Sequence, residues 1–186
     1  MKQPSSYWHF RESQKRIQVH QGGTRSGKTY SILQGLIQLS HLHSGGGLVI
    51  TICRKTLPSL KASSMRDFFQ ILMSEGIYSE TFHNKSEGTY LLFGNLFEFI
   101  SIDQPQKVRG RKRDVLFINE ANEISLEDWR QLVLRTTWKV ILDYNPSDEF
   151  HWIYDQVITR PDADFYQTTY KDNPHLDETT VQEIER

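Results

Sequence analysis

The stretch Gly22–Thr29 sets the tightest limit on how this chain can fold. Its sequence, Gly-Gly-Thr-Arg-Ser-Gly-Lys-Thr, fits the Walker A pattern of a loop whose backbone N–H groups surround phosphate groups. A strand is predicted before it at 17–20 and a helix after it at 28–43, so the positive end of the helix would face the phosphates. We therefore predict a nucleoside triphosphate site contacted by the whole loop: Gly22, Gly23, Thr24, Arg25, Ser26, Gly27, Lys28 and Thr29.

Three side chains of residues 22–29, called the phosphate loop below, have predicted catalytic or metal-binding roles. Lys28 is expected to reach the β- and γ-phosphates, and the Thr29 hydroxyl is expected to hold Mg²⁺. Arg25 lies inside the loop, from where it could reach the γ-phosphate bound by the same chain. The loop alone therefore predicts both phosphate binding and stabilisation of charge on the transferred group.

Size and composition exclude several classes of protein. With 186 residues and a formal net charge of −1, the chain is expected to form one domain, and any contact with nucleic acid needs a local basic patch. Cys53 is the sole cysteine, which excludes an intrachain disulfide and a thiolate zinc cluster, and its apolar neighbours predict a buried, inert thiol. No signal peptide opens the sequence and no apolar stretch is long enough for a bilayer, so we expect a cytosolic protein without a membrane partner.

Apolar runs alternate with helical patterns along the chain. Strands are predicted at 17–20, 48–53, 115–118, 138–144 and 164–168, and helices at 28–43, at 59–74, from Ser125 onward and at 149–159. A small hairpin insertion is predicted around Gly94-Asn95. This order predicts an α/β fold with a mostly parallel central sheet flanked by helices. With the phosphate loop it indicates a P-loop NTPase of the additional-strand type, in which strand 138–144 lies between strands 17–20 and 115–118.

The segment Val115–Glu120 is the candidate for the second half of an active site. Its apolar residues are followed by Asn119 and Glu120 at the carboxyl end of the strand, where open α/β sheets bind their ligands. Glu120 would be the general base that deprotonates the attacking water, although a solvated strand-end glutamate is the alternative. Asn119 stands where an aspartate is usual and would hold Mg²⁺ through water without a charge, so either metal affinity is weaker or Asp114 or another acid compensates.

Polar side chains also end the next strand, in Leu142–Pro146. In the additional-strand arrangement Asp143 or Asn145 would lie beside the γ-phosphate and could sense its presence. The alternative is an ordinary turn, because aspartate and Asn-Pro are frequent in turns. The other motifs favour the sensing role.

Five basic residues fall within Lys107–Arg113. A solvated loop is the simplest interpretation. The run directly precedes the glutamate strand, however, so it could contact DNA phosphates or provide an arginine that acts on the nucleotide of a neighbouring subunit.

Aromatic residues Tyr7, Trp8 and Phe10 precede the first strand. They could belong to the core. They could also stack on adenine, with Gln14 or Gln21 hydrogen bonding to its edge. The sequence leaves these alternatives open, and Gln21 is kept as a candidate nucleotide contact.

Several segments, in order, resemble the ATPase domain of the large terminase subunit of tailed bacteriophages. They are the phosphate loop, Cys53–Lys61 after the second strand, Arg109-Gly110 before the glutamate strand 115–121, Asp143–Pro146 followed by His151-Trp152, and Thr168–Pro174. Residues 143–146, together with His151 and Trp152, resemble the coupling motif of that family. The similarity covers nearly the whole chain, and the ordered set of motifs is more specific than any piece except the phosphate loop.

This resemblance implies a Mg²⁺-dependent ATPase whose ligands are ATP and Mg²⁺. It implies that hydrolysis drives double-stranded viral DNA into a procapsid in the host cytoplasm, with the portal, a small terminase subunit and a homo-oligomeric ring, commonly a pentamer, as partners. Residues 1–186 would be the ATPase domain, truncated before a nuclease domain. Lys28, Thr29 and Glu120 would carry the chemistry, Asn145 would belong to the coupling motif, and Arg109 would act in trans.

Two other functions remain compatible with the motifs. One is a different additional-strand ATPase, such as a helicase, but helicase motifs are not found after Asn145. The other is a nucleotide-binding switch with little hydrolysis, which the neutral Asn119 keeps open.

Overall fold

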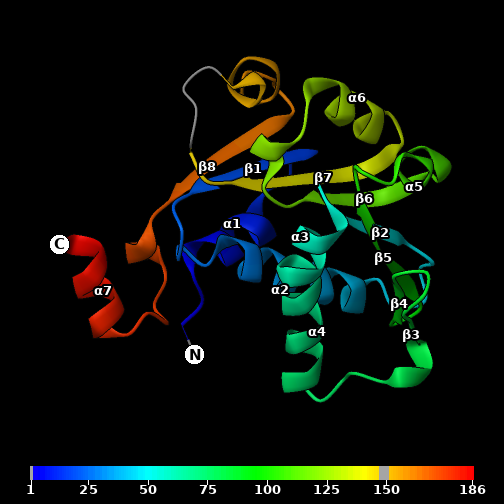
Figure 1. The fold of residues 1–186 in the computed structure, drawn as a ribbon, viewed down its shortest axis with the longest axis horizontal. Coiled ribbons are helices and arrows are strands. Elements are labelled where there is room, and N and C mark those ends of the chain that lie inside the picture. The colour runs from blue at the N-terminus through cyan, green and yellow to red at the C-terminus, as the bar shows by residue number, and fades with distance from the viewer. Residues whose placement is uncertain (1, 147–150) are drawn as a thin grey trace.

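The computed structural model describes residues 2–146 and 151–186, which form a mixed sheet of eight strands with helices on both faces (Figure 1). The order in the sheet is β3-β4-β5-β2-β6-β7-β1-β8. Neighbouring strands are parallel throughout the part β5-β2-β6-β7-β1-β8, and at the other edge β4 is antiparallel to both β3 and β5. The strands are β1 (Ile17–Gly22), β2 (Val49–Arg54), β3 (His83–Asn84), β4 (Thr89–Leu92), β5 (Asn95–Ser101), β6 (Arg113–Ile118), β7 (Thr136–Tyr144) and β8 (Ala163–Thr168).

The helices cover the sheet unevenly. Figure 1 shows α1, α2 and α4 below the sheet and α6 above it. The helices are α1 (Ser5–Glu12), α2 (Lys28–Leu42), α3 (Leu57–Ala62), α4 (Ser64–Ser74), α5 (Pro105–Gly110), α6 (Leu126–Leu134) and α7 (Glu178–Glu185), with short helical turns at Glu80–Phe82, Ala121–Glu123, Tyr154–Ile158 and Tyr170–Asp172. None of the helices within these described residues is long and apolar enough to cross a membrane.

The sheet separates two apolar cores because successive strand side chains point to opposite faces. In β6, Phe117 packs with residues of α2 and α4, whereas its neighbours Leu116 and Ile118 pack with Trp129 and Leu132 of α6. The central strands are therefore buried on both sides, as their continuous apolar sequences predict.

The predicted fold class is confirmed, including the place of β7 between β1 and β6. The helix predicted from Ser125 onward is α6, and it begins with a capping box: the Ser125 side chain accepts from the Asp128 N–H, and the Asp128 side chain accepts from the Ser125 N–H. Of the helix predicted at 149–159, residues 149 and 150 lie outside the described residues, and the remainder contains the π-helical turn Tyr154–Ile158.

Two local predictions are wrong. The helix predicted at 59–74 is interrupted at Ser63, where φ is −128° and ψ is −104°, so that α3 and α4 are separate helices. The hairpin turn consists of Phe93 and Gly94, one residue earlier than predicted. Asn95 is a buried strand residue instead, because its side chain accepts from the Leu48 N–H at 2.9 Å and donates to carbonyl groups at the end of α2.

The aromatic residues before β1 belong to α1. Phe10 is buried against Gly35 of α2, where a Cβ atom would lie 2.3 Å from the Phe10 ring, so only glycine permits this close packing. Tyr7 donates a hydrogen bond to Gln38 at 2.7 Å, and Trp8 is 45% exposed. The core interpretation therefore applies to Phe10.

We predict that Phe68→Ala lowers the unfolding free energy by about 3–5 kcal/mol, because it leaves a cavity in the larger core. Phe68 is fully buried, and its ring centroid lies 4.8 Å from that of Phe97 and 5.2 Å from that of Phe99. Urea denaturation measures the change. Phe82→Ala is the matched control, since Phe82 is 50% exposed, and equal losses in both variants would contradict this account of the core.

Candidate active site

The carboxyl ends of β1, β6 and β7 meet at one edge of the sheet, because these strands are parallel and adjacent. The phosphate loop begins at the end of β1, Asn119 and Glu120 follow β6, Asp143 belongs to the end of β7, and Asn145 directly follows β7. The fold thus gathers three sequence-predicted segments in one place, although they lie far apart along the chain.

The phosphate loop turns sharply before α2. Gly27 has φ of +79° and Arg25 has φ of +71°, so both are in the left-handed region. Helix α2 begins at Lys28 without a side-chain cap, which leaves its first N–H groups available to an anion. Gly23, Thr24 and Arg25 are exposed on this loop, while Gly22 and Ser26 are buried.

Two phosphate-loop side chains contact the end of β7. Lys28 Nζ donates to Asn145 Oδ1 at 2.6 Å, and the Thr29 hydroxyl donates to Asp143 Oδ2. Lys28 is 5% exposed and Asp143 is fully buried, so these contacts lie inside the protein edge rather than on its surface. The residues predicted to bind phosphate and metal are therefore joined to those predicted to sense the γ-phosphate.

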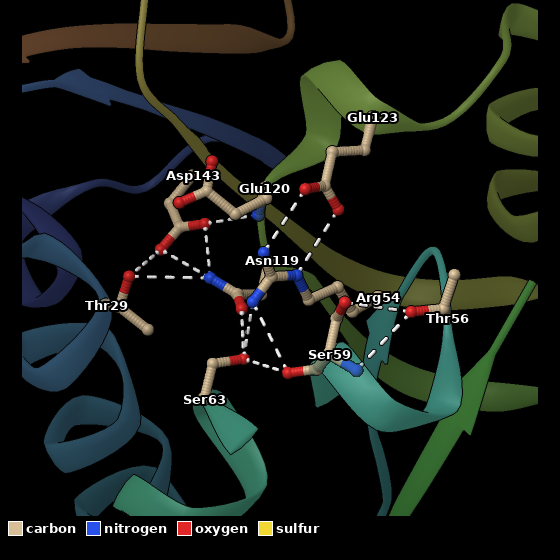
Figure 2. Close-up of polar contacts among 9 residues, drawn as sticks. All are labelled: Thr29, Arg54, Thr56, Ser59, Ser63, Asn119, Glu120, Glu123 and Asp143. Atoms are coloured by element: carbon tan, nitrogen blue, oxygen red, sulfur yellow. Dashed lines mark hydrogen bonds and ion pairs between the residues drawn. The ribbon is translucent and has the colours of Figure 1, made fainter. Parts of the chain in front are cut away.

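Asn119 presents its amide nitrogen, not its oxygen, to this cluster (Figure 2). Nδ2 donates to Asp143 at 2.9 Å and lies 3.5 Å from the Thr29 hydroxyl, whereas Oδ1 lies 3.3 Å from the Ser63 hydroxyl. The carboxylate accepts only, so it fixes the amide in this orientation. The oxygen through which Asn119 was expected to hold a metal-bound water thus faces away from Thr29.

Asp114 lies at the opposite end of β6 and cannot compensate for the neutral Asn119. Its carboxylate accepts from the Val49 N–H at 2.8 Å and from the Thr137 hydroxyl at 3.1 Å, both near the amino ends of their strands. The acid that does contact Asn119 is Asp143.

Glu120 occupies a strained turn directly after Asn119. Its φ of 53° and ψ of 56° are left-handed, and its N–H donates to Asp143 Oδ1 at 2.8 Å. The side chain is half-buried, and burial followed by the charge of Asp143 raises the pKa of the Glu120 carboxyl, against the smaller opposing effects of Lys28 and Arg54. A raised pKa makes a carboxylate a stronger base, which suits proton transfer from water.

The sequence prediction missed a second polar network beside Asn119 (Figure 2). Arg54, at the end of β2, donates to both carboxylate oxygens of Glu123 at 3.2 and 3.3 Å and to the Ser63 hydroxyl at 2.7 Å. Ser63 occupies the break between α3 and α4 and lies next to the amide oxygen of Asn119. Arg54 could have been predicted from the sequence, because it is the polar residue at the carboxyl end of a buried parallel strand, the edge at which open α/β sheets bind their ligands.

A second missed residue is Asn173, which follows β8. Its Nδ2 donates to the Arg25 backbone oxygen at 2.9 Å, and its side chain also packs against Gly27. Asn173 therefore holds the phosphate loop from the far end of the chain. The family resemblance included this segment, but the sequence offered no signal for the contact.

Residues that correspond to the coupling motif in the family resemblance contact both sides of the site. While Asn145 meets Lys28, the Trp152 indole N–H donates to the Ile124 carbonyl at 3.0 Å, and His151 Nε2 lies 2.9 Å from the Asn122 carbonyl. Both carbonyl groups belong to the segment just after Glu120.

Three other predicted site residues lie at the periphery. The Gln21 amide oxygen accepts from the Tyr144 hydroxyl at 2.9 Å and from the Tyr154 hydroxyl at 2.5 Å, so it faces these tyrosines. The Arg25 side chain has no hydrogen-bond or ion-pair partner among residues 2–146 and 151–186. Arg109 is exposed on α5.

The basic run around Arg109 is not one solvated loop. Lys107 and Arg109 belong to α5, and Arg113 is 1% exposed in β6, where it donates to the carbonyl groups of Leu132 and Val108. Arg113 thus joins α5 and α6 to the sheet. Lys107, Arg109, Arg111 and Lys112 remain exposed and available to a partner.

The fold and the arrangement of this edge define a P-loop NTPase of the additional-strand type. A family model of the phage terminase large subunit matches residues 14–186, and the chain therefore belongs to that family. A search of curated proteins gave no match.

Solved structures of large terminases have the same fold. The large terminase of a thermophilic bacteriophage matches with a TM-score of 0.86 at 15% identity, over 100% of this chain and 50% of that one. The same terminase in complex with ATP-γ-S matches with a TM-score of 0.77 at 16% identity, over 98% and 48%. The large terminase ATPase domain of a Thermus phage matches with a TM-score of 0.70 at 15% identity, over 100% and 87%. This chain thus spans about half the length of the first of these proteins.

We predict that Asn173→Ala weakens ATP binding about fivefold, because one hydrogen bond to the strained phosphate loop contributes about 1 kcal/mol. Titration with a fluorescent ATP analogue measures the affinity. Asn84→Ala is the matched control, since the Asn84 side chain accepts comparable hydrogen bonds in the exposed turn between β3 and β4. Unchanged affinity in Asn173→Ala would show that the loop holds its shape without this contact.

Proposed function

We propose that this chain is a Mg²⁺-dependent ATPase whose hydrolysis of ATP drives double-stranded viral DNA into a procapsid. The observation that carries the proposal is the position of Glu120, half-buried at the end of β6, next to a β7 end that contacts both Lys28 and Thr29. Membership of the phage terminase large subunit family favours DNA packaging over a helicase function.

The side chains present suit in-line attack of water on the γ-phosphate. Glu120 is the proposed base that takes a proton from the water, and its raised pKa assists this transfer. Lys28 and the N–H groups at the start of α2 stabilise the negative charge on the phosphates. Arg25, exposed within the phosphate loop, is a further candidate for this role in the same chain.

The donor set around Thr29 fits Mg²⁺, which prefers hard oxygen ligands and keeps several waters. The Thr29 hydroxyl is the phosphate-loop oxygen that would hold it, and a carboxylate, that of Asp143, is in contact with this hydroxyl. When bound, Mg²⁺ would supply positive charge that offsets the negative charge of the transferred phosphoryl group.

The coupling motif is proposed to link the phosphates to the base. Asn145 touches Lys28, and Trp152 touches the segment that follows Glu120. A change in the position of Lys28 on phosphate release would alter its contact with Asn145 in this motif. This supports a sensing role for Asn145 and Asp143.

Assembly completes the proposal. Residues 1–186 would be the ATPase domain of a longer protein that also has a nuclease domain and works as a homo-oligomeric ring, commonly a pentamer. The ring would act in the host cytoplasm with a portal and a small terminase subunit. Exposed Arg109 is the proposed trans-acting arginine, and the other exposed basic residues of its run are candidates for DNA phosphates.

We predict that Glu120→Gln lowers ATP turnover about 100-fold or more while ATP affinity stays within about twofold, because the change removes the base and keeps the shape. Phosphate release and equilibrium binding measure the two quantities. Glu127→Gln on exposed α6 is the control. Equal turnover in both variants would exclude Glu120 as the base. Tight binding without turnover in the wild type, on DNA and at high protein concentration, would favour the nucleotide switch.

A trans-acting Arg109 predicts complementation. Arg109→Ala and Glu120→Gln should each be nearly inactive alone, and mixing them should restore part of the turnover, because an intact Glu120 then meets an intact Arg109 from its neighbour. Arg130→Ala, which removes an exposed arginine of α6 outside the run, is the control and should keep its activity. Absence of recovery at concentrations where light scattering shows assembly would count against Arg109.

A further inference from the structure

Asn119 and Asp143 occupy neighbouring positions on adjacent strands. Ile118 of β6 is paired with Leu142 of β7, so the next residues, Asn119 and Asp143, lie side by side. Only one of this pair is charged, and it is the one on β7. Because β7 lies between β6 and β1, the carboxylate is one strand nearer the phosphate loop than a carboxylate at position 119 would be.

The environment of Asp143 is prepared for a negative charge. Its side chain is fully buried and accepts from three donors: the Thr29 hydroxyl, the Asn119 amide at 2.9 Å and the Glu120 N–H at 2.8 Å. No Lys, Arg or His of the described chain forms an ion pair with it within 4.0 Å. A buried carboxylate held only by neutral donors is costly, and a cation beside it would offset that cost.

The direction of the hydrogen bonds fixes where such a cation would lie. Oδ1 accepts from the Glu120 N–H at 2.8 Å and from the Asn119 amide at 2.9 Å, whereas Oδ2 accepts from the Thr29 hydroxyl and has a longer contact of 3.3 Å with the same Asn119 amide. Thr29 is the phosphate-loop hydroxyl that holds Mg²⁺ in P-loop NTPases. Asp143 therefore directs its charge at the oxygen already assigned to the metal.

We propose that Asp143, not Asn119, supplies the carboxylate of the Mg²⁺ shell, directly or through one water, and that Asn119 is a positioning residue that orients it. This inference rests on the proposed function, because the cation is the one that accompanies ATP. The carboxylate of the metal site would thus come from β7 instead of from the residue after β6. The neutral Asn119 therefore does not leave the metal without a charged partner.

Metal-dependent nucleotide binding tests the proposal without turnover. The affinity for a non-hydrolysable ATP analogue is measured by calorimetry with Mg²⁺ and with EDTA, for the wild type, Asp143→Asn and Asp114→Asn. Asparagine can still accept from the Glu120 N–H and the Asn119 amide, so Asp143→Asn should bind the analogue in EDTA as tightly as the wild type does. The factor by which Mg²⁺ increases the affinity should be about 10- to 100-fold smaller in Asp143→Asn than in the wild type. Asp114→Asn, a neutralised carboxylate at the far edge, should match the wild type.

A Mg²⁺ effect in Asp143→Asn equal to that in the wild type would overturn the inference and leave the ATPase proposal intact. A wild type that binds no nucleotide would overturn both.

A second measurement does not depend on the folding of the variant. With Mn²⁺ and the same analogue bound to wild-type protein labelled with ¹³C at aspartate carboxyl groups, electron–nuclear double resonance should detect a ¹³C coupling. Absence of that coupling would overturn the assignment of Asp143.

Discussion

The parallel insertion of β7 between β1 and β6 is the constraint on which the site depends. It places Asp143 and Asn145 at the same edge of the sheet as the phosphate loop and Glu120. Contacts across this edge then connect three segments: Lys28 with Asn145, Thr29 with Asp143, and Asn119 with Asp143. If β7 were at the margin of the sheet, the same motifs would exist without meeting.

Charge is distributed at this edge so that each acid has a different environment. Glu123 is paired with Arg54, and its charge is compensated. Asp143 is buried and held by neutral donors, which keep an acceptor directed at Thr29. Burial and the nearby charge of Asp143 raise the pKa of the Glu120 carboxyl, which favours its role as a base. In the proposed mechanism, Glu123 anchors Arg54, Asp143 is the metal partner and Glu120 is the base.

Apolar runs and strand-end polar residues were sufficient to predict the sheet and the segments that form the site. Glu120 comes shortly after β6 and Asp143 lies near the end of β7, and the parallel topology determines where they meet. The sequence could not predict contacts that depend on side-chain packing across the fold. The break at Ser63 accompanies a hydrogen bond from Arg54, the hairpin register depends on buried Asn95, and the orientation of the Asn119 amide depends on its neighbour Asp143.

The contact between Asn173 and the phosphate loop has a consequence for synthesis of the chain. The two residues joined by it, Arg25 and Asn173, are 148 positions apart. A ribosome that adds about 5–20 residues per second needs about 7–30 s to cover that distance. During this interval the nascent loop lacks the amide that holds its left-handed turn, so the fully restrained phosphate loop is acquired only when nearly the whole domain has been made.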